Sequence, residues 1–314
     1  MANCNDLFKK FQEEISIPGK KRERMMTSKK GLRDRIRKDF KEKHPGYNPK
    51  FYVQGSDKMK TAIRTEDDIC DLDDGVYFMR EPDVNATTLQ QWIKDAVNGY
   101  TDTEPEHRKK CIRNIFTSDY EIDMPVYYKV DGKEYQLAVK DNGFEDSDPK
   151  AMVDWFNARK DKGGMLVNNV KDLKAWCDHE PNKMPSGLAM TILATNAKSK
   201  IVHNEREDIT LRDTLKEIKK ALDFKFECVV PVTPNDNLFA NYTQERKKNF
   251  LTALDEFIED ADKALKEPNQ LKASKLWRKH LGDRFPEGED KNENQYSSIG
   301  IATGAASSRP WAKL

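Results

Sequence analysis

Two aspartates, Asp71 and Asp73, occupy alternate positions in the apolar segment 69–79, whose sequence is ICDLDDGVYFM. The alternation predicts a β-strand, and residues two apart on a strand project from the same face, with Cα atoms roughly 6.5–7 Å apart. Carboxylates at that separation can share a pair of divalent ions, since two-metal sites hold their ions about 3.5–4 Å apart. An Asp-x-Asp pair alone also fits a solvated strand face, so other residues must show whether this strand carries a metal site.

Two further segments favour a metal site that handles phosphates. Gly55-Ser56 follows a short predicted strand at 51–53, and a Gly-Ser turn that opens a helix exposes the backbone N–H groups and hydroxyl that phosphate binding requires. Asp123 lies among apolar residues in a predicted strand at 122–130, where an unpaired carboxylate would be costly. We therefore expect Asp71, Asp73 and Asp123 to be catalytic and to bind two Mg²⁺ ions, with Mn²⁺ as an alternative. Asp123 is also a candidate general base for an attacking ribose hydroxyl.

Taken in order, three motifs resemble those of the polymerase-β-type nucleotidyltransferases. Within that superfamily they are similar to the bacterial cGAS/DncV-like nucleotidyltransferases (CD-NTases), the cyclases of CBASS anti-phage systems. The motifs are Gln54-Gly55-Ser56, Asp71-Leu72-Asp73-Asp74-Gly75 and Ile122-Asp123-Met124-Pro125. The resemblance implies that Gln54, Gly55 and Ser56 bind nucleotide, with Ser56 at the donor phosphate. Asp74 is expected to serve the structure of the strand bend and not the metal.

The resemblance extends more loosely into the second half of the chain, where Ser147-Asp148-Pro149 matches the opening of the family's second domain. It implies that Lys174 and Ser186 grip the donor triphosphate, a task suited to the point charge and long stem of lysine. From the residues alone, Lys174 also fits a solvated helix position, and Ser186 fits an ordinary helix cap. Met59 stands where some relatives carry an aromatic ring for stacking on a base, which leaves the choice of nucleotides open.

The surrounding pattern predicts an α+β fold, a polymerase-β-like nucleotidyltransferase core with a mixed twisted sheet plus a mostly helical second lobe. Strands are expected at 51–53, 69–79, 122–130 and 134–139, the last two joined by an Asp131-Gly132 turn. Helices are expected at about 1–15, 24–43, 87–99, 105–117, 149–160, 165–178, 187–198, 210–221, 244–266 and 270–281. We expect three regions: a core with N-terminal helices at 1–145, a helical nucleotide-binding lobe (OAS/PAP-like) at 146–285, and a flexible polar tail at 286–314.

Composition and cysteine usage narrow the class of protein. The chain of 314 residues has no apolar run near the roughly 20 residues that a membrane span needs, and its N-terminus lacks the apolar region of a secretory signal. Its five cysteines are scattered, without CxxC spacing, which argues against a disulfide framework or a zinc site. We therefore expect a cytoplasmic protein without membrane contact.

Two segments raise the question of partners. Residues 18–50 are rich in lysine and arginine, and in animal relatives the corresponding helix binds double-stranded nucleic acid. We favour a solvated helix face, with no nucleic acid required for activity. In some operons of the family an E1/E2-like partner acts on the C-terminus of the cyclase, and the segment 297–314 with its lone apolar Trp311 is a candidate for such handling. The alternative is a C-terminal end without a partner.

The resemblance implies an enzyme that joins ATP and a second nucleoside triphosphate by in-line attack on the α-phosphate, with release of pyrophosphate. Repeated steps on a retained intermediate would give a cyclic di- or trinucleotide second messenger for anti-phage defence. Two alternatives stay open. One is a linear oligonucleotide or tRNA/poly(A)-type nucleotide-adding enzyme on the same core, and the other is an inactive scaffold of the same fold.

Overall fold

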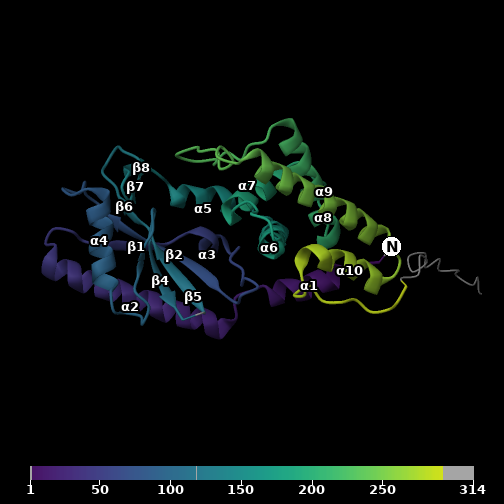
Figure 1. The fold of residues 1–314 in the computed structure, drawn as a ribbon, viewed down its shortest axis with the longest axis horizontal. Helices are drawn as coiled ribbons and strands as arrows, with labels where there is room; N and C mark the ends of the chain where they lie inside the picture. The colour runs from purple at the N-terminus through teal and green to yellow at the C-terminus, as the bar shows by residue number, and fades with distance from the viewer. Residues whose placement is uncertain (1, 118, 293–314) are drawn as a thin grey trace, which may run out of the picture.

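The computed structural model describes residues 2–117 and 119–292. It has two lobes, one built on a sheet and one built from helices (Figure 1). The helices of the described residues are α1 (Asn5–Glu14), α2 (Gly19–Lys43), α3 (Gly55–Met59), α4 (Ala86–Val97), α5 (Pro149–Asn157), α6 (Met165–His179), α7 (Gly187–Lys198), α8 (Glu207–Phe224), α9 (Gln244–Lys266) and α10 (Gln270–Leu281). The strands are β1 (Lys50–Val53), β2 (Cys70–Phe78), β3 (Glu106–His107), β4 (Ile112–Phe116), β5 (Tyr120–Met124), β6 (Val126–Tyr128), β7 (Gln136–Val139) and β8 (Gly143–Asp146).

One mixed sheet forms the first lobe. Its order is β3-β4-β5-β2-β6-β7-β8, and β1 pairs with β2 outside that path. The central strand β2 runs parallel to β5 and β6 and antiparallel to β1. Together with the helical second lobe, this confirms the α+β fold predicted from the sequence.

Helices α2 and α4 cover one face of this sheet, and their apolar side chains form a core with Leu72, Val76 and Phe78 of β2. Asp71 and Asp73, which have the opposite parity on β2, face the other way and are less buried. The alternation along the strand therefore decides which side of the sheet carries the acidic residues, as the sequence predicted.

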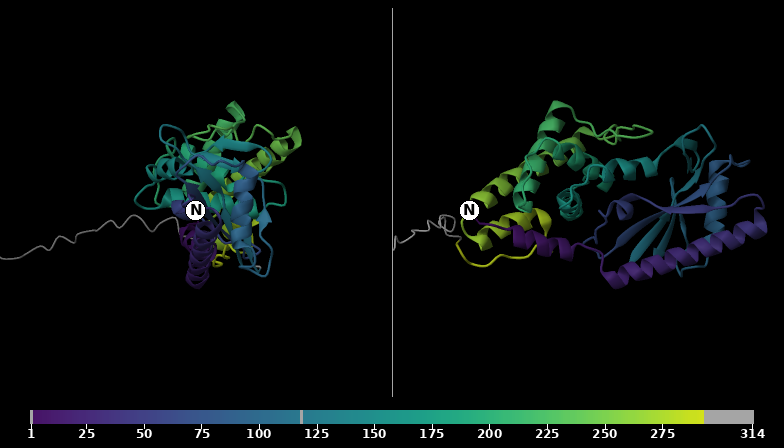
Figure 2. Two further views of the ribbon diagram at one scale, coloured as in Figure 1. Left: turned by 90° about the vertical axis from the view of Figure 1, so that its left-hand side faces the viewer. Right: turned by 180° about the vertical axis from the view of Figure 1, so that it is seen from behind.

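The second lobe is a helical bundle around Trp176, Phe257 and Trp277. Helix α1 packs into this bundle, because the Phe8 ring lies 5.1 Å from the Trp277 ring and 4.9 Å from the Phe285 ring, measured between centroids. Figure 1 and Figure 2 both show the start of α1 beside α10. The expected boundary had assigned all of residues 1–145 to the core, so α1 is a correction to it. The helical spacing of apolar residues predicted which face of α1 is buried, but not whether that face packs on the sheet or in the helical lobe.

The helix expected at 105–117 is wrong. The segment forms β3 and β4, and β4 pairs antiparallel with β5 from Ile112↔Met124 to Phe116↔Tyr120. Short apolar runs fit helical and extended spacing alike, so the partner strand decides the outcome.

Part of the expected flexible tail is ordered. Residues 286–292 run along the first turns of α10, where Gly288 N donates to Ser274 Oγ at 2.8 Å and Gln270 N donates to the Lys291 carbonyl at 3.1 Å. These bonds hold a segment that has no apolar period of its own. The remaining tail residues, including Trp311, lie outside the described residues.

Two findings bear on the class of protein. Within the described residues, no helix combines the length and apolar character that a membrane span requires. The five cysteines are all free thiols, as their spacing predicted.

Candidate active site

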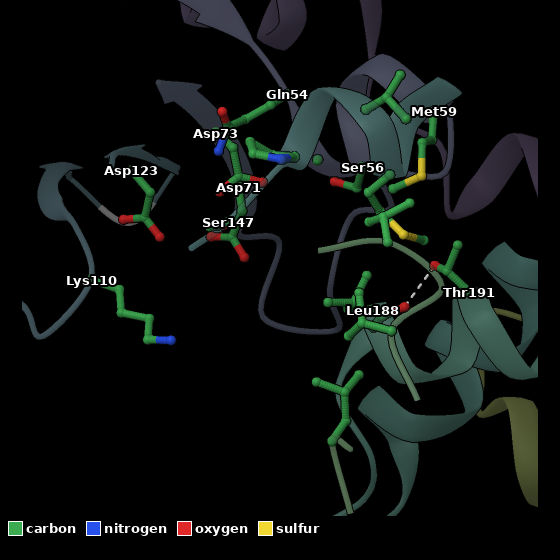
Figure 3. Close-up of a pocket in the computed structure, with 18 of the residues that line it drawn as sticks. Gln54, Ser56, Met59, Asp71, Asp73, Lys110, Asp123, Ser147, Leu188 and Thr191 are labelled. Atoms are coloured by element: carbon green, nitrogen blue, oxygen red, sulfur yellow. Dashed lines mark hydrogen bonds between the residues drawn. The ribbon is translucent and has the colours of Figure 1, made fainter. Parts of the chain in front are cut away.

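A cavity of about 640 Å³ is lined by both lobes. Figure 3 shows Asp71, Asp73 and Asp123 on its sheet side, with Leu188 and Thr191 of α7 across from them. Of the residues predicted for the site, the ones that line this cavity are Gln54, Gly55, Ser56, Asp71, Asp73, Asp123 and Lys174. The fold therefore gathers residues that lie more than a hundred positions apart in the sequence.

Strand register brings the carboxylates together. Parallel pairing of β2 with β5 places Asp73 opposite Asp123 and Asp71 opposite Glu121. Adjacent strands lie about 4.8 Å apart, so these acidic side chains are near neighbours on one face of the sheet. Glu121 was not predicted from the sequence, because only the register of β5 against β2 brings it beside Asp71.

The two aspartates of β2 are costly to ionise where they lie. Burial, followed by the negative charges of Asp123 and Asp71, raises the pKa of Asp73 to about 7. Burial also raises the pKa of Asp71, although the charge of Arg113 opposes this. Among the ion pairs of the described residues, none joins a lysine or arginine to Asp73. Neighbouring carboxylates that no lysine or arginine neutralises are suited to divalent metal ions, so the residues present fit the implied metal.

Arg113 of β4 is a site residue that the sequence reasoning missed. Its Nε donates to Asp123 Oδ1 at 2.8 Å and its Nη2 donates to Asp123 Oδ2 at 2.7 Å, while its third nitrogen pairs with Glu121. Burial opposes the charged guanidinium, but the hydrogen bonds and charge of Asp123 outweigh it and raise the pKa of Arg113. Arg113 thus occupies both oxygens of Asp123, which must be released before this carboxylate can bind a metal ion or accept a proton.

This pairing agrees with a second observation. In the described part of the chain, no three histidine, cysteine or acidic side chains gather closely enough to hold a metal ion. Asp123 lies on the strand next to Asp73 but is turned to Arg113. Asp71 and Asp73 are therefore available to bind metal ions, whereas Asp123 is held by Arg113.

The Gly55-Ser56 turn lies directly against Asp73. Gly55 has φ +61°, a conformation that favours glycine, and a Cβ added to it would lie 2.1 Å from Asp73 Oδ2. Only a residue without a side chain allows this approach. Ser56 follows in the first turn of α3 and lines the cavity beside the aspartates, as Figure 3 shows.

Lys174 and Ser186 make different contacts. The Lys174 ammonium donates to the Thr61 carbonyl at 2.9 Å and to Thr61 Oγ1 at 3.1 Å. Burial lowers the pKa of Lys174 to about 8, although the charges of Asp73 and Asp71 oppose this. Ser186 caps α7 by accepting a hydrogen bond from Ala189 N at 3.3 Å, and it is not among the residues that line the cavity.

Asp74 faces away from the cavity. It is fully buried and forms a bidentate pair with Arg33 of α2, in which Arg33 Nε donates to Asp74 Oδ2 at 2.7 Å. This contact ties α2 to the strand that carries the aspartates, in agreement with the structural role predicted for Asp74.

Comparisons with known proteins agree with this geometry. Residues 49–127 match the family model for the nucleotidyltransferase domain of cyclic GMP-AMP synthase DncV-like proteins. The chain is 26% identical over 245 residues to a cyclic GMP-AMP synthase of Escherichia albertii, covering 70% of this chain and 55% of that protein. It is 25% identical over 257 residues to a cyclic AMP-AMP-AMP synthase of an Acinetobacter strain, covering 75% of this chain and 72% of that protein. The chain thus spans about half the length of the first of these relatives.

Solved structures show the same fold. The Vibrio cholerae DncV cyclic AMP-GMP synthase superposes with a TM-score of 0.80 at 18% identity, covering 91% of this chain and 98% of that chain. The 3′-deoxy GTP-bound form of Escherichia coli DncV gives a TM-score of 0.76 at 18% identity, covering 87% and 93%.

The fold is that of a polymerase-β-type nucleotidyltransferase. Its defining features are the alternate aspartates on β2, the acidic neighbour on β5 and the Gly-Ser turn over them. Within that class, residues 49–127 match the model of the DncV-like nucleotidyltransferase domain. The chain is therefore similar to the bacterial cGAS/DncV-like nucleotidyltransferases, the CD-NTases.

Proposed function

We propose that this protein is a metal-dependent nucleotidyltransferase that makes a cyclic di- or trinucleotide from ATP and a second nucleoside triphosphate, releasing pyrophosphate. The observation that carries the proposal is the meeting of Asp71, Asp73 and Asp123 with the Gly55-Ser56 turn in one cavity. The names of the relatives, one a cyclic GMP-AMP synthase and one a cyclic AMP-AMP-AMP synthase, support a cyclic product.

The residues divide the work as follows. Asp71 and Asp73 would hold two Mg²⁺ ions, for which Mn²⁺ could substitute, and Asp123 would join them once released by Arg113. When bound, such ions neutralise charge on the leaving pyrophosphate and lower the pKa of the attacking hydroxyl. Ser56 and the backbone of its turn orient the donor phosphates beside Asp73.

Two lysines are suited to the triphosphates. Lys174 lines the cavity, and its ammonium, now bound to Thr61, would have to leave that contact to reach a phosphate. Lys110 extends into the other side of the cavity near Asp123, as Figure 3 shows, and its one ion pair among the described residues is to the partly exposed Glu145. An exposed pair of this kind is weak, so Lys110 is free to bind an incoming phosphate.

A cyclic product requires the linear intermediate to stay bound while its second end reaches the metal site. The cavity is suited to this because its far wall is apolar and comes from the helical lobe, with Val230, Val232 and Leu238 in one loop and Leu188 on α7. A base held against that wall would keep the intermediate between the lobes.

For the partners and the biological setting we propose anti-phage defence in a CBASS system, in the cytoplasm, with an E1/E2-like protein acting on the C-terminal tail. Nucleic acid is not required in this account. Several basic residues of α2 are already paired within the protein, for example Arg22 with Asp57, Arg24 with Asp119 and Arg33 with Asp74.

The double variant Asp71→Asn with Asp73→Asn tests the catalytic assignment. We expect it to abolish product formation while retaining the thermal melt, because amides of the same shape replace carboxylates that are costly to ionise. Asp131→Asn, in the exposed turn between β6 and β7, is a matched control with full activity. Product above a few per cent in the double variant would contradict the assignment of these aspartates.

A further inference from the structure

The side chain of Gln54, at the edge of the nucleotide cavity, is bound by a cluster of tyrosines. Gln54 is 7% exposed and does not cap the helix α3 that begins after it. Instead its Nε2 donates to the Tyr127 hydroxyl at 3.0 Å, and its Oε1 accepts from the Tyr77 hydroxyl at 2.7 Å. Both polar ends of the carboxamide are therefore satisfied by protein, which is what fixes a buried amide in one orientation.

The two tyrosines are themselves held firmly. Tyr77 on β2 pairs in register with Tyr127 on β6, and their rings stack with centroids 4.7 Å apart. The backbone of Gln54 is tied to the same strand, since Gln54 N donates to the Asp73 carbonyl at 3.0 Å. Gln54 is thus attached to β2 at two points, one of them at a catalytic residue.

A glycine makes room for this contact. A Cβ added to Gly75 would lie 2.6 Å from Gln54 Oε1 and 2.6 Å from Tyr77 Cε2, and the φ of Gly75 is not positive. Space, and not backbone conformation, therefore requires glycine here. The Gln-Gly-Ser and Asp-Leu-Asp-Asp-Gly motifs are therefore in contact, because Gly75 at the end of the second leaves room for Gln54 at the start of the first.

The helical lobe reaches the same cluster through Lys150, in the first turn of α5. The Lys150 ammonium lies 3.5 Å from the Tyr52 ring centroid, 4.7 Å from that of Tyr77 and 4.8 Å from that of Tyr135, and it donates to the Tyr135 hydroxyl at 3.1 Å. A cation is disfavoured at the N-terminal end of a helix, so the tyrosines account for its position.

We propose that Gln54 is a positioning residue for nucleotidyl transfer: bound to Tyr77 and Tyr127, it fixes the Gly55-Ser56 turn over Asp73, and Lys150 couples the seating of α5 to that turn. This rests on the proposed function, because the turn is assigned to the donor phosphates. The turn lies so close to Asp73 that a displacement of about 1 Å would alter the alignment of phosphate and carboxylate.

Gln54→Met tests the proposal, because methionine has nearly the same volume and no group that bonds to the tyrosines. Tyr77→Phe removes one of the two bonds alone. A matched control is Tyr120→Phe, which removes the bond of another buried tyrosine hydroxyl, to Ser28 Oγ at 2.8 Å, away from the turn.

We expect Gln54→Met to lower kcat for pyrophosphate release by about ten- to one-hundredfold, with KM changed by less than about threefold. Tyr77→Phe should lower kcat less, and should have no further effect when added to Gln54→Met, since both act through one contact. Tyr120→Phe should keep the kcat of the wild type. A raised KM with unchanged kcat would show that Gln54 contacts nucleotide directly, and independent effects of the two substitutions would show that Tyr77 does not act through it. Either result overturns the proposal.

Hydrogen exchange of the backbone amides of residues 55–60 provides a readout that needs no catalysis. Exchange should be faster in Gln54→Met, Tyr77→Phe and Lys150→Met, and unchanged in Tyr120→Phe. Unchanged exchange in Gln54→Met would overturn the positioning role, and unchanged exchange in Lys150→Met alone would overturn the coupling to α5. If the wild type makes no product with any nucleotide, the proposed function fails, while the exchange experiment still decides whether Gln54 fixes the turn.

Discussion

Replacing Gly55 with alanine is the most local test of the contact between the phosphate turn and Asp73. Two costs are expected. The positive φ of +61° disfavours any residue with a Cβ by roughly 1–2 kcal/mol. The new methyl group would lie 2.1 Å from Asp73 Oδ2, and restoring an ordinary contact requires the turn and the carboxylate to move apart, which costs about 1–3 kcal/mol more.

The expected loss in the free energy of unfolding is therefore about 2–5 kcal/mol. Activity should fall further than stability alone explains, since a displacement of about 1 Å at a reacting group can lower kcat by about one-hundredfold. Urea unfolding measures the first quantity, and kcat for pyrophosphate release at saturating nucleotide measures the second.

Gly99→Ala is the matched control, because Gly99 also has a positive φ, +70°, but has no atom within 4 Å of the added Cβ. It should lose only the backbone term of roughly 1–2 kcal/mol and keep its kcat. Equal losses of stability in the two variants, with kcat unchanged in both, would refute the close packing of Gly55 on Asp73.

Three other predictions follow from the site and its surroundings. Arg113→Gln frees Asp123, so the Mg²⁺ concentration at half-maximal activity should fall, and an unchanged or higher value in a metal titration would contradict the pairing. Asp74→Asn breaks a buried bidentate pair and should cost about 3–5 kcal/mol in urea unfolding while activity per folded molecule is retained; lost activity in the folded fraction would instead indicate a catalytic role. Burial and then the charge of neighbouring Glu207 raise the pKa of Asp172. The contribution of Asp172 to stability is therefore full below the ordinary carboxyl pKa of about 4, and it is lost as pH rises through the pKa of the folded state. Asp172→Asn should therefore melt at a higher temperature than the wild type at alkaline pH, by a margin that shrinks in acid, and a margin independent of pH would contradict this.

The catalytic strand could be predicted from the sequence because its evidence is local. Alternation over 69–79 fixed both the strand and the shared face of Asp71 and Asp73, and the structure has this strand as β2. The Gly-Ser turn was equally local. In both segments the residues adjacent in the sequence determine the local conformation.

Arg113 could not be found in the same way. The segment 105–117 was expected to be a helix, and on a helix Arg113 has no defined relation to Asp123. As part of β4 it lies directly across from Asp123 on β5. The partner of Arg113 is set by strand pairing, which no short-range pattern in the sequence specifies.

Long-range packing explains the other differences. The apolar stripe of α1 fits either core, and only its contacts with Trp277 and Phe285 decide that it joins the helical lobe. Gln54 lines the cavity, but the tyrosines that bind its side chain lie 23 and 73 positions away and were not predicted. Contacts between residues so far apart become visible once the chain is folded.

The identity of the product tests the central claim most directly. The purified protein is incubated with all four labelled nucleoside triphosphates and Mg²⁺ or Mn²⁺, treated with phosphatase, and the surviving species is identified by mass spectrometry. The account predicts a phosphatase-resistant cyclic di- or trinucleotide, absent from the Asp71→Asn and Asp73→Asn double variant. Only linear products, or a nucleotide tail added to supplied RNA, would contradict the cyclase assignment and favour a nucleotide-adding enzyme on the same fold.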